Sequence, residues 1–214
     1  MTDSTLKGGL MAVACPVDLD AGRLRHEIQA IYTRVATDPS SEFHFHRGPA
    51  YAAERLGYDV SALAAIPAEA TASFAGVANP LRMAALPPGA TVVDIGCGAG
   101  MDLMLAASAV GPTGKTIGID MTEPMAERAR AAARALGFAQ VEVRAGDALD
   151  LPVDSGSVDF VITNGVLNLA PDKRQAFLEV FRILKPGGQF LYADTIVANE
   201  LSESIRRDID LWTG

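Results

Sequence analysis

The sequence predicts an α/β fold built on a doubly wound, mostly parallel β-sheet, and two features support that prediction. The first is a strand-to-helix junction, in which the run Thr91–Val93 leads through Asp94 into alternating glycines and an apolar helical segment. The second is the regular alternation of strand-like and helix-like segments from residue 89 onward, which favours parallel strands joined by helices. In such sheets, ligands bind at the carboxyl ends of the strands.

Composition and charge exclude several classes of protein. The 214 residues are enough for one domain with a sizeable core. Lys and Arg total 18 against 26 Asp and Glu, and the net charge of −8 argues against a nucleic-acid partner. Cys15 and Cys97 cannot form a disulfide framework, and no segment approaches the length of a membrane span. The run Gly8–Ala14 is too short for a secretion signal, so we expect a cytoplasmic protein with no membrane contact.

The segment before the core is expected to form a helical cap. Apolar residues at helical spacing predict an amphipathic helix from Leu24 to Val35, which Asp38–Ser40 ends. Short helices are expected at Tyr51–Leu56 and Ser61–Ile66, with Asp59 near the N-cap of the second. Several prolines then lead the chain into the core.

The segment Phe43–Pro49 holds two of the three histidines of the chain. If it were extended, His44 and His46 would share one face and the two phenylalanines the other. Such a pair can ligate a metal, and His26 supplies the only other imidazole. Because a metal site needs three or four supported ligands, we favour a lid with buried phenylalanines, hydrogen-bonded or solvated histidines and no metal.

The first half of the core repeats a strand–helix pattern. After the predicted helix Met101–Val110, a second strand at Lys115–Ile119 ends at Asp120. An acidic residue at the tip of the second strand suits the hydroxyls of a ribose. Thr122 is expected to cap the next helix, which Gly137 ends.

The second half completes the predicted sheet. Strands are expected at Gln140–Arg144 and Val158–Thr163, and a helix at Lys173–Leu184. A turn at Lys185–Gly188 then leads into a fifth strand, Gln189–Ala193. The helix carries a stripe of apolar residues that we expect to pack on the sheet, namely Ala176, Phe177, Val180, Phe181 and Leu184.

The spacing of the glycines separates two classes of ligand. A dinucleotide fingerprint, G-x-G-x-x-G/A, would need a small residue where Met101 stands. The segment Asp94–Gly100 instead has the pattern D-x-G-x-G-x-G, which resembles the first motif of class I S-adenosylmethionine (SAM)-dependent methyltransferases, whose sheet is Rossmann-like. In that class an acidic residue after the third strand meets the adenine amino group, and Asp147 fits, although an Asp in a turn or helix cap is its structural alternative. The resemblance implies a SAM site formed by Asp94, Gly96, Cys97, Gly98, Gly100, Asp120, Met121, Gly146, Asp147, Ala148 and Asn164.

From about Tyr51 to Trp212 the chain also resembles the arsenite methyltransferase family. The matching segments are Leu56–Tyr58, Ile66–Pro67, Asn79–Pro80, Gly118–Thr122, Asn168–Lys173 and Leu184–Gly188. That family holds trivalent arsenic through cysteine thiolates, which suit a soft metalloid. This chain has Val77 and Gly165 at two of the family's cysteine positions, so the resemblance implies the scaffold with a different acceptor, and we expect no useful methylation of arsenite.

The sequence therefore indicates a SAM-dependent methyltransferase with a small-molecule methyl acceptor, whose identity stays open. Candidate polar groups near the reacting methyl are His44, His46, Tyr51, Asn79, Asn164 and Asn168, each with a structural alternative in closing the cap. The missing cysteines also suit a non-catalytic SAM-binding sensor or subunit, and arsenite methyltransferase proper is a further alternative. A nicotinamide oxidoreductase is disfavoured by Met101.

The expected organisation has four segments: a loose leader at 1–23, a helical cap or lid at 24–88, a SAM-binding core at 89–200 and a C-terminal amphipathic helix at 201–214. Class I methyltransferases normally add two strands after the fifth, but only 20 residues follow Asp194. We therefore expect the sheet to be truncated, with its fifth strand as an edge. That edge would be covered by a partner subunit, as in a homo-oligomer, or by the N-terminal segment, unless the chain is a fragment, which we favour.

Overall fold

The computed structural model describes residues 20–38 and 41–196. At its centre is a five-stranded sheet in which all neighbouring strands are parallel. The strands lie in the order β3-β2-β1-β4-β5, so the winding reverses between β1 and β4. Their bounds are β1 (Thr91–Ile95), β2 (Lys115–Asp120), β3 (Val141–Ala145), β4 (Val158–Asn164) and β5 (Leu184–Ala193). The predicted doubly wound α/β fold is confirmed.

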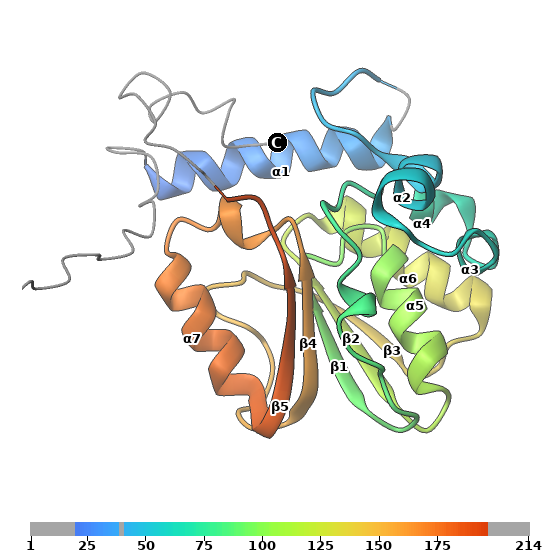
Figure 1. Cartoon of the computed structure of the whole chain (residues 1–214). Coiled ribbons are helices and arrows are strands. Elements are labelled where there is room, and N and C mark those ends of the chain that lie inside the picture. The colour runs from blue at the N-terminus through green and yellow to red at the C-terminus, as the bar shows by residue number, and fades with distance from the viewer. Residues whose placement is uncertain (1–19, 39–40, 197–214) are drawn as a thin grey trace, which may run out of the picture.

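Helices cover both faces of the sheet, with α5 and α6 on one side and α7 on the other (Figure 1). These helices are α5 (Met101–Val110), α6 (Glu123–Leu136) and α7 (Lys173–Ile183). Successive residues of β1 point to opposite faces, and both faces are buried. Val92 joins a cluster with Val110 of α5, whereas Val93 joins a cluster with Ile183 of α7. This burial on both sides explains why the strands are apolar runs rather than alternating ones.

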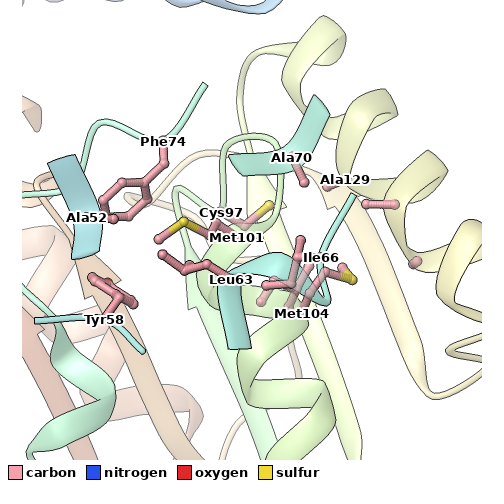
Figure 2. Close-up of a cluster of buried hydrophobic side chains, with 13 residues drawn as sticks. Ala52, Tyr58, Leu63, Ile66, Ala70, Phe74, Cys97, Met101, Met104 and Ala129 are labelled. Atoms are coloured by element: carbon pink, nitrogen blue, oxygen red, sulfur yellow. The ribbon is translucent and has the colours of Figure 1, made fainter. Parts of the chain in front are cut away.

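The cap packs mainly on the outside of α5 and α6, and its last segment lies against β4 and β5. Its elements after the first helix are α2 (Gly48–Leu56), α3 (Val60–Ala64), α4 (Ala68–Ala72) and the 3₁₀ helix η1 (Pro80–Arg82). Figure 2 shows the buried cluster at this junction, in which Tyr58, Ile66 and Phe74 of the cap meet Met101 and Met104 of α5. The expected short helices are confirmed, whereas α4 and η1 were not predicted.

Helix α1 (Ala21–Thr37) crosses the edge of the sheet where the strands end (Figure 1). Its first turn is capped by Asp20, whose side chain accepts hydrogen bonds from the N–H groups of Gly22 and Arg23. The buried face of the helix includes Leu24, Ile28 and Val35, as the apolar spacing predicted. The amphipathic helix expected from residues 24 to 35 is therefore confirmed.

The expected apolar stripe of α7 is partly wrong. Ala176 and Val180 are buried as predicted, and Phe177, although 42% exposed, packs edge-on against Phe190 and Tyr192 of β5. Phe181, however, is 80% exposed. Ile183 completes the buried face instead, because residues spaced by four and then three share one side of a helix.

Two further expectations about local structure need correction. The segment expected as a turn, 185–188, lies within β5. Leu184 pairs with Val158 of β4, but the next paired residue of β5, Gln189, lies opposite Phe160, so β5 contains a bulge between these two pairs. Thr122 occupies the N-cap position of α6, but its side chain makes no capping hydrogen bond.

The histidine segment is bent rather than extended. His44 packs edge-on against Phe45, with ring centroids 5.3 Å apart, and His46 stacks on Tyr51 at 5.2 Å. Within residues 20–38 and 41–196, no three His, Cys, Asp or Glu side chains gather as a metal site would require. No helix in the same ranges is long and apolar enough to cross a membrane.

Strand β5 pairs only with β4 among the described strands, so it is an edge there, as expected. The predicted C-terminal helix, with Leu201 and Trp212 on its apolar face, lies outside the described residues, as does nearly all of the leader at 1–23.

Candidate active site

The loop between β1 and α5 contains three glycines with φ in the left-handed region, 68° at Gly96, 53° at Gly98 and 96° at Gly100. A Cβ atom built on Gly98 would meet nothing within 4 Å, so the backbone there is open to a ligand. A Cβ atom on Gly100 would lie 3.1 Å from the Cβ of Ala129. Gly100 therefore serves the close approach of α5 to α6.

A pocket opens beside this loop, at the carboxyl ends of the strands, and contains about 1130 Å³ of empty space including the part open to solvent. The structure brings ten of the eleven expected cofactor residues to its wall, namely Asp94, Gly96, Cys97, Gly98, Asp120, Met121, Gly146, Asp147, Ala148 and Asn164. The eleventh, Gly100, does not line it.

Carboxylates give the floor of the pocket a negative character. Asp94 and Asp102 are buried, and Asp120 lies beside them. Burial, followed by the negative charges of Asp102 and Asp120, raises the pKa of Asp94 well above its usual range. Its Oδ2 atom is buried without a hydrogen-bond partner. A ligand that brings positive charge and N–H donors would satisfy this oxygen.

Asp120 is held rigidly at the tip of β2. One carboxylate oxygen accepts a hydrogen bond from the Gly98 N–H, and the other accepts one from the Thr122 N–H, both at 2.8 Å. Burial raises the pKa of Asp120, and these hydrogen bonds oppose that shift. The contacts tie the glycine loop to β2 and orient the carboxylate that was expected to meet a ribose.

Asp147 makes the turn contact of its structural alternative and also lines the pocket. Its Oδ1 atom accepts the Leu149 N–H at 2.9 Å, as an Asp in a turn does, and its side chain also lines the pocket. Its Oδ2 atom forms an ion pair with Arg25 Nη2 at 2.8 Å. Helix α1 therefore reaches the carboxylate that was expected to meet adenine.

Asn164, at the end of β4, joins the cap to the core. Its amide oxygen accepts the N–H groups of Val77 at 2.8 Å and Ala78 at 3.2 Å. Its amide nitrogen donates to Asp102 Oδ2 at 2.9 Å and also lies within hydrogen-bond distance of the Tyr58 hydroxyl and the Ala78 carbonyl. The Tyr58 hydroxyl donates to Asp102 Oδ1 at 2.7 Å. The side chain of Asn164 is thus fully engaged in structure.

The other catalytic candidates stand away from the pocket. His44, His46 and Tyr51 do not line it, and neither do Asn79 and Asn168, whose side-chain oxygens are buried without partners. Asn164 is the candidate from the sequence that the structure places in the wall.

The two positions at which the chain lacks cysteines face each other. A Cβ atom built on Gly165 would lie 3.4 Å from Val77 Cγ1. Gly165 follows β4 and lines the pocket, whereas Val77 belongs to the cap loop before η1.

Among the wall residues that sequence reasoning did not place at the site are Arg25, Tyr32, Phe74 and Asp102. The first three come from the cap, and periodicity alone could not show which way the cap docks. Asp102 carried a usable signal, because it is an acidic residue in the apolar run that follows the glycines.

These residues suit SAM. The cofactor brings an ammonium group, a positive sulfonium and two ribose hydroxyls, which match the unpartnered Asp94 oxygen, the open Gly98 backbone and the fixed Asp120 carboxylate. The parallel sheet and this pocket at its switch point together define a class I, SAM-dependent methyltransferase domain.

Comparison with known proteins gives the family. Residues 86–213, more than half of the chain, match the family model described as a methyltransferase domain, and the chain belongs to that family. An arsenite methyltransferase of Halobacterium salinarum is 42% identical over 161 residues, which cover 75% of this chain and 41% of that protein. A demethylmenaquinone methyltransferase of Bacillus cytotoxicus is 33% identical over 115 residues, 54% of this chain and 48% of the relative.

Among solved structures, an arsenic(III) SAM methyltransferase from Chlamydomonas reinhardtii matches with a TM-score of 0.63 and 35% identity, covering 68% of this chain and 51% of that one. The chain thus spans about half or less of the length of these relatives.

Proposed function

We propose that this protein transfers the methyl group of SAM to a small-molecule acceptor. The observation that supports this most strongly is the buried, unpartnered Asp94 oxygen in a pocket whose glycine loop leaves the backbone open at Gly98. SAM supplies an electrophilic methyl group on a positive sulfur. Methyl transfer is an in-line displacement, so a protein can accelerate it by positioning the reactants and excluding water.

Each of three carboxylates would bind a different group of the cofactor. Asp94 would accept hydrogen bonds from the ammonium group, Asp120 would accept them from the ribose hydroxyls, and Asp147 from the adenine amino group. Asp147 is paired with Arg25, so this contact needs a second lone pair of the carboxylate or a shift of α1. The catalytic names of the relatives do not favour a non-catalytic role. The proposed activity would place the protein in the cytoplasm, where SAM is made and used.

We infer that the acceptor is not trivalent arsenic. Although arsenite methyltransferases are among the relatives, soft metalloids need thiolates, and the facing positions 77 and 165 hold Val and Gly. The Cys97 thiol is buried, and burial raises its pKa well above the usual range, so it stays protonated at neutral pH.

A screen with SAM carrying a labelled methyl group tests the function. The purified protein is incubated with pools of thiols, phenols, amines and arsenite, and labelled products are detected by mass spectrometry. We expect a labelled organic product, formed in step with S-adenosylhomocysteine, and no methylarsenicals. Formation of methylarsenicals at the rate of SAM consumption would overturn the choice of acceptor, and no labelled product from any pool would contradict the activity.

A further inference from the structure

The pocket has two halves, because the sheet order reverses between β1 and β4. The β1, β2 and β3 ends carry the carboxylates and glycines assigned above to the cofactor. The β4 end and the cap loop form the other half, lined by the polar Ser73 and Asn164 and by six residues without polar side chains, Phe74, Ala75, Gly165, Val166, Leu169 and Ala170. None of these six side chains carries a charge or a hydrogen-bonding group. This half therefore favours an uncharged, apolar molecule.

Few groups of the described residues could hold a proton there. The Asn164 amide is engaged with the cap at Val77 and with Asp102, and the Ser73 hydroxyl donates to the Val35 carbonyl. Burial, followed by the charges of Asp120 and Asp194, raises the pKa of Tyr32 to about 12, so its hydroxyl stays protonated. Tyr58 is likewise buried, and its pKa is raised. Asp102 remains: it lines the pocket, and its hydrogen bonds with Tyr58 and Asn164 place it beside the cap and the end of β4.

The Asp102 carboxylate can accept further hydrogen bonds. Oδ1 accepts one hydrogen bond from the Tyr58 hydroxyl at 2.7 Å, and Oδ2 accepts one from Asn164 Nδ2 at 2.9 Å. Because each carboxylate oxygen can accept two hydrogen bonds, one site per oxygen stays open. The two partners fix the position of the carboxylate, which is what a group that must meet a ligand requires.

We propose that the acceptor is an uncharged, apolar molecule with an O–H or S–H group, and that Asp102 accepts the hydrogen bond and then the proton of that group. This inference rests on the proposed methyltransferase function. The acceptor oxygen or sulfur forms a bond to the methyl carbon as the bond from that carbon to the sulfonium breaks, and the sulfur keeps the electron pair. The acceptor proton passes to an Asp102 oxygen, so the positive sulfonium and the negative carboxylate both end neutral.

The electrostatics of the site agree with this role. Burial raises the pKa of Asp102 to about 6, against the opposing hydrogen bonds of Asn164 and Tyr58. The facing groups are Asp94 from β1, whose pKa the charge of Asp102 raises, and Tyr58 from the cap. At neutral pH the Asp102 carboxylate is ionised and ready to accept a proton, and its burial favours the neutral acid that results.

The test uses the full chain saturated with S-adenosylhomocysteine and two probes of the same shape, 2-naphthol and 2-methoxynaphthalene. We expect 2-naphthol to bind about tenfold more tightly or better than its ether, because only the naphthol donates a hydrogen bond to a charged acceptor. Its affinity should rise as the pH increases through about 6, the pKa of Asp102. Equal affinities for the two probes, or no binding of either, would overturn the inference.

Two variants and a control complete the experiment. Asp102→Asn should bind S-adenosylhomocysteine but lose both the preference for 2-naphthol over its ether and the pH dependence of naphthol binding. The control Asp154→Asn, at an exposed position, should keep both the preference and the pH dependence. Tyr58→Phe removes a hydrogen bond that lowers the pKa of Asp102, so the pH midpoint should move upward. An unchanged midpoint would count against Asp102 even if Asp102→Asn failed to fold. Failure of the wild type to bind S-adenosylhomocysteine would instead contradict the proposed function.

Discussion

At the scale of the residue, Asp94 shows how a binding site can lower the stability of the ligand-free protein. Its side chain is buried, it lies near two other carboxylates, and one of its oxygens has no partner. Such an arrangement is unfavourable in the free protein, since a buried charge needs a compensating group. A cationic ligand would supply that group, so binding would relieve the unfavourable burial of the carboxylate and gain affinity from it.

Asp94→Asn should therefore separate stability from binding. Because burial and the neighbouring carboxylates disfavour the ionised form of Asp94, we expect the free energy of unfolding of the variant at pH 7 to be equal to or higher than that of the wild type. The substitution also removes a charged acceptor, which should weaken SAM binding by roughly 10- to 100-fold. Urea unfolding and calorimetry measure the two effects. A variant that bound SAM as tightly as the wild type would show that Asp94 does not meet the ammonium group.

Gly98→Val tests the open backbone of the loop. The added side chain would occupy empty space in the pocket, and we expect it to abolish cofactor binding. A matched control is Gly156→Val, because Gly156 also has a left-handed φ, 62° against 53°, and a Cβ there would likewise meet nothing within 4 Å. Both variants carry the backbone penalty of about 1–2 kcal/mol, but Gly156 lies outside the pocket. Equal loss of cofactor binding in both variants would mean that backbone strain, and not a side chain filling the pocket at Gly98, is responsible.

At the scale of the element, helix α1 covers the pocket mainly through apolar contact. The Arg25–Asp147 pair is partly exposed, with 42% and 32% of the two side chains accessible, and pairs of this kind contribute about 0–1 kcal/mol. Ile28 is only 4% exposed and lines the pocket from the same helix.

Ile28→Ala should loosen α1 far more than Arg25→Ala does. Truncating a buried Ile costs about 2–5 kcal/mol, so hydrogen exchange of the α1 amides should become clearly faster in that variant and change little in Arg25→Ala. Ile196→Ala is the matched control, because Ile196 is 86% exposed. Faster exchange in Arg25→Ala than in Ile28→Ala would show that the ion pair holds the helix.

The elements also show what a sequence can and cannot specify. The helix expected at Met101–Val110 matches α5 at both ends, because the glycines before it and Gly111 after it are local signals. The position of Asp120 in the pocket was predictable as well, since parallel strands end at one edge. The place of Tyr32 was not predictable, because it depends on how the cap docks. Asp102 stood out as an acid in an apolar run, but its contacts depend on partners at positions 58 and 164. The burial of Phe181 was wrongly predicted for a related reason, because an apolar residue next to the buried stripe of a helix can still face outward.

At the scale of the whole molecule, the raised pKa values of the pocket acids predict how stability depends on pH. The folded state raises the pKa of Asp94, Asp102 and Asp120 above the unfolded value of about 3.9, so it binds more protons than the unfolded state. Their contribution is therefore fully present below pH 4 and is lost as the pH rises through their folded values, about 6 for Asp102.

We accordingly expect the free chain to lose stability between pH 5 and pH 7. The carboxyls with lowered pKa, such as Glu142 at about 2, act below this window. Burial also raises the pKa of Asp194, which therefore adds to the effect of the pocket acids. Urea unfolding at three pH values measures the slope, and the Asp94→Asn variant should flatten it. Stability that rises across the window would contradict the electrostatic account of the pocket.

The pocket at the carboxyl ends of β1, β2 and β3 is proposed to bind SAM, and titration calorimetry of the folded wild-type chain with SAM tests this most directly. We expect saturable binding with one molecule per chain, and affinity that increases from pH 5 to pH 7 as the pocket carboxylates ionise and attract the positive cofactor. A folded chain that takes up no SAM at millimolar concentration would contradict this proposal.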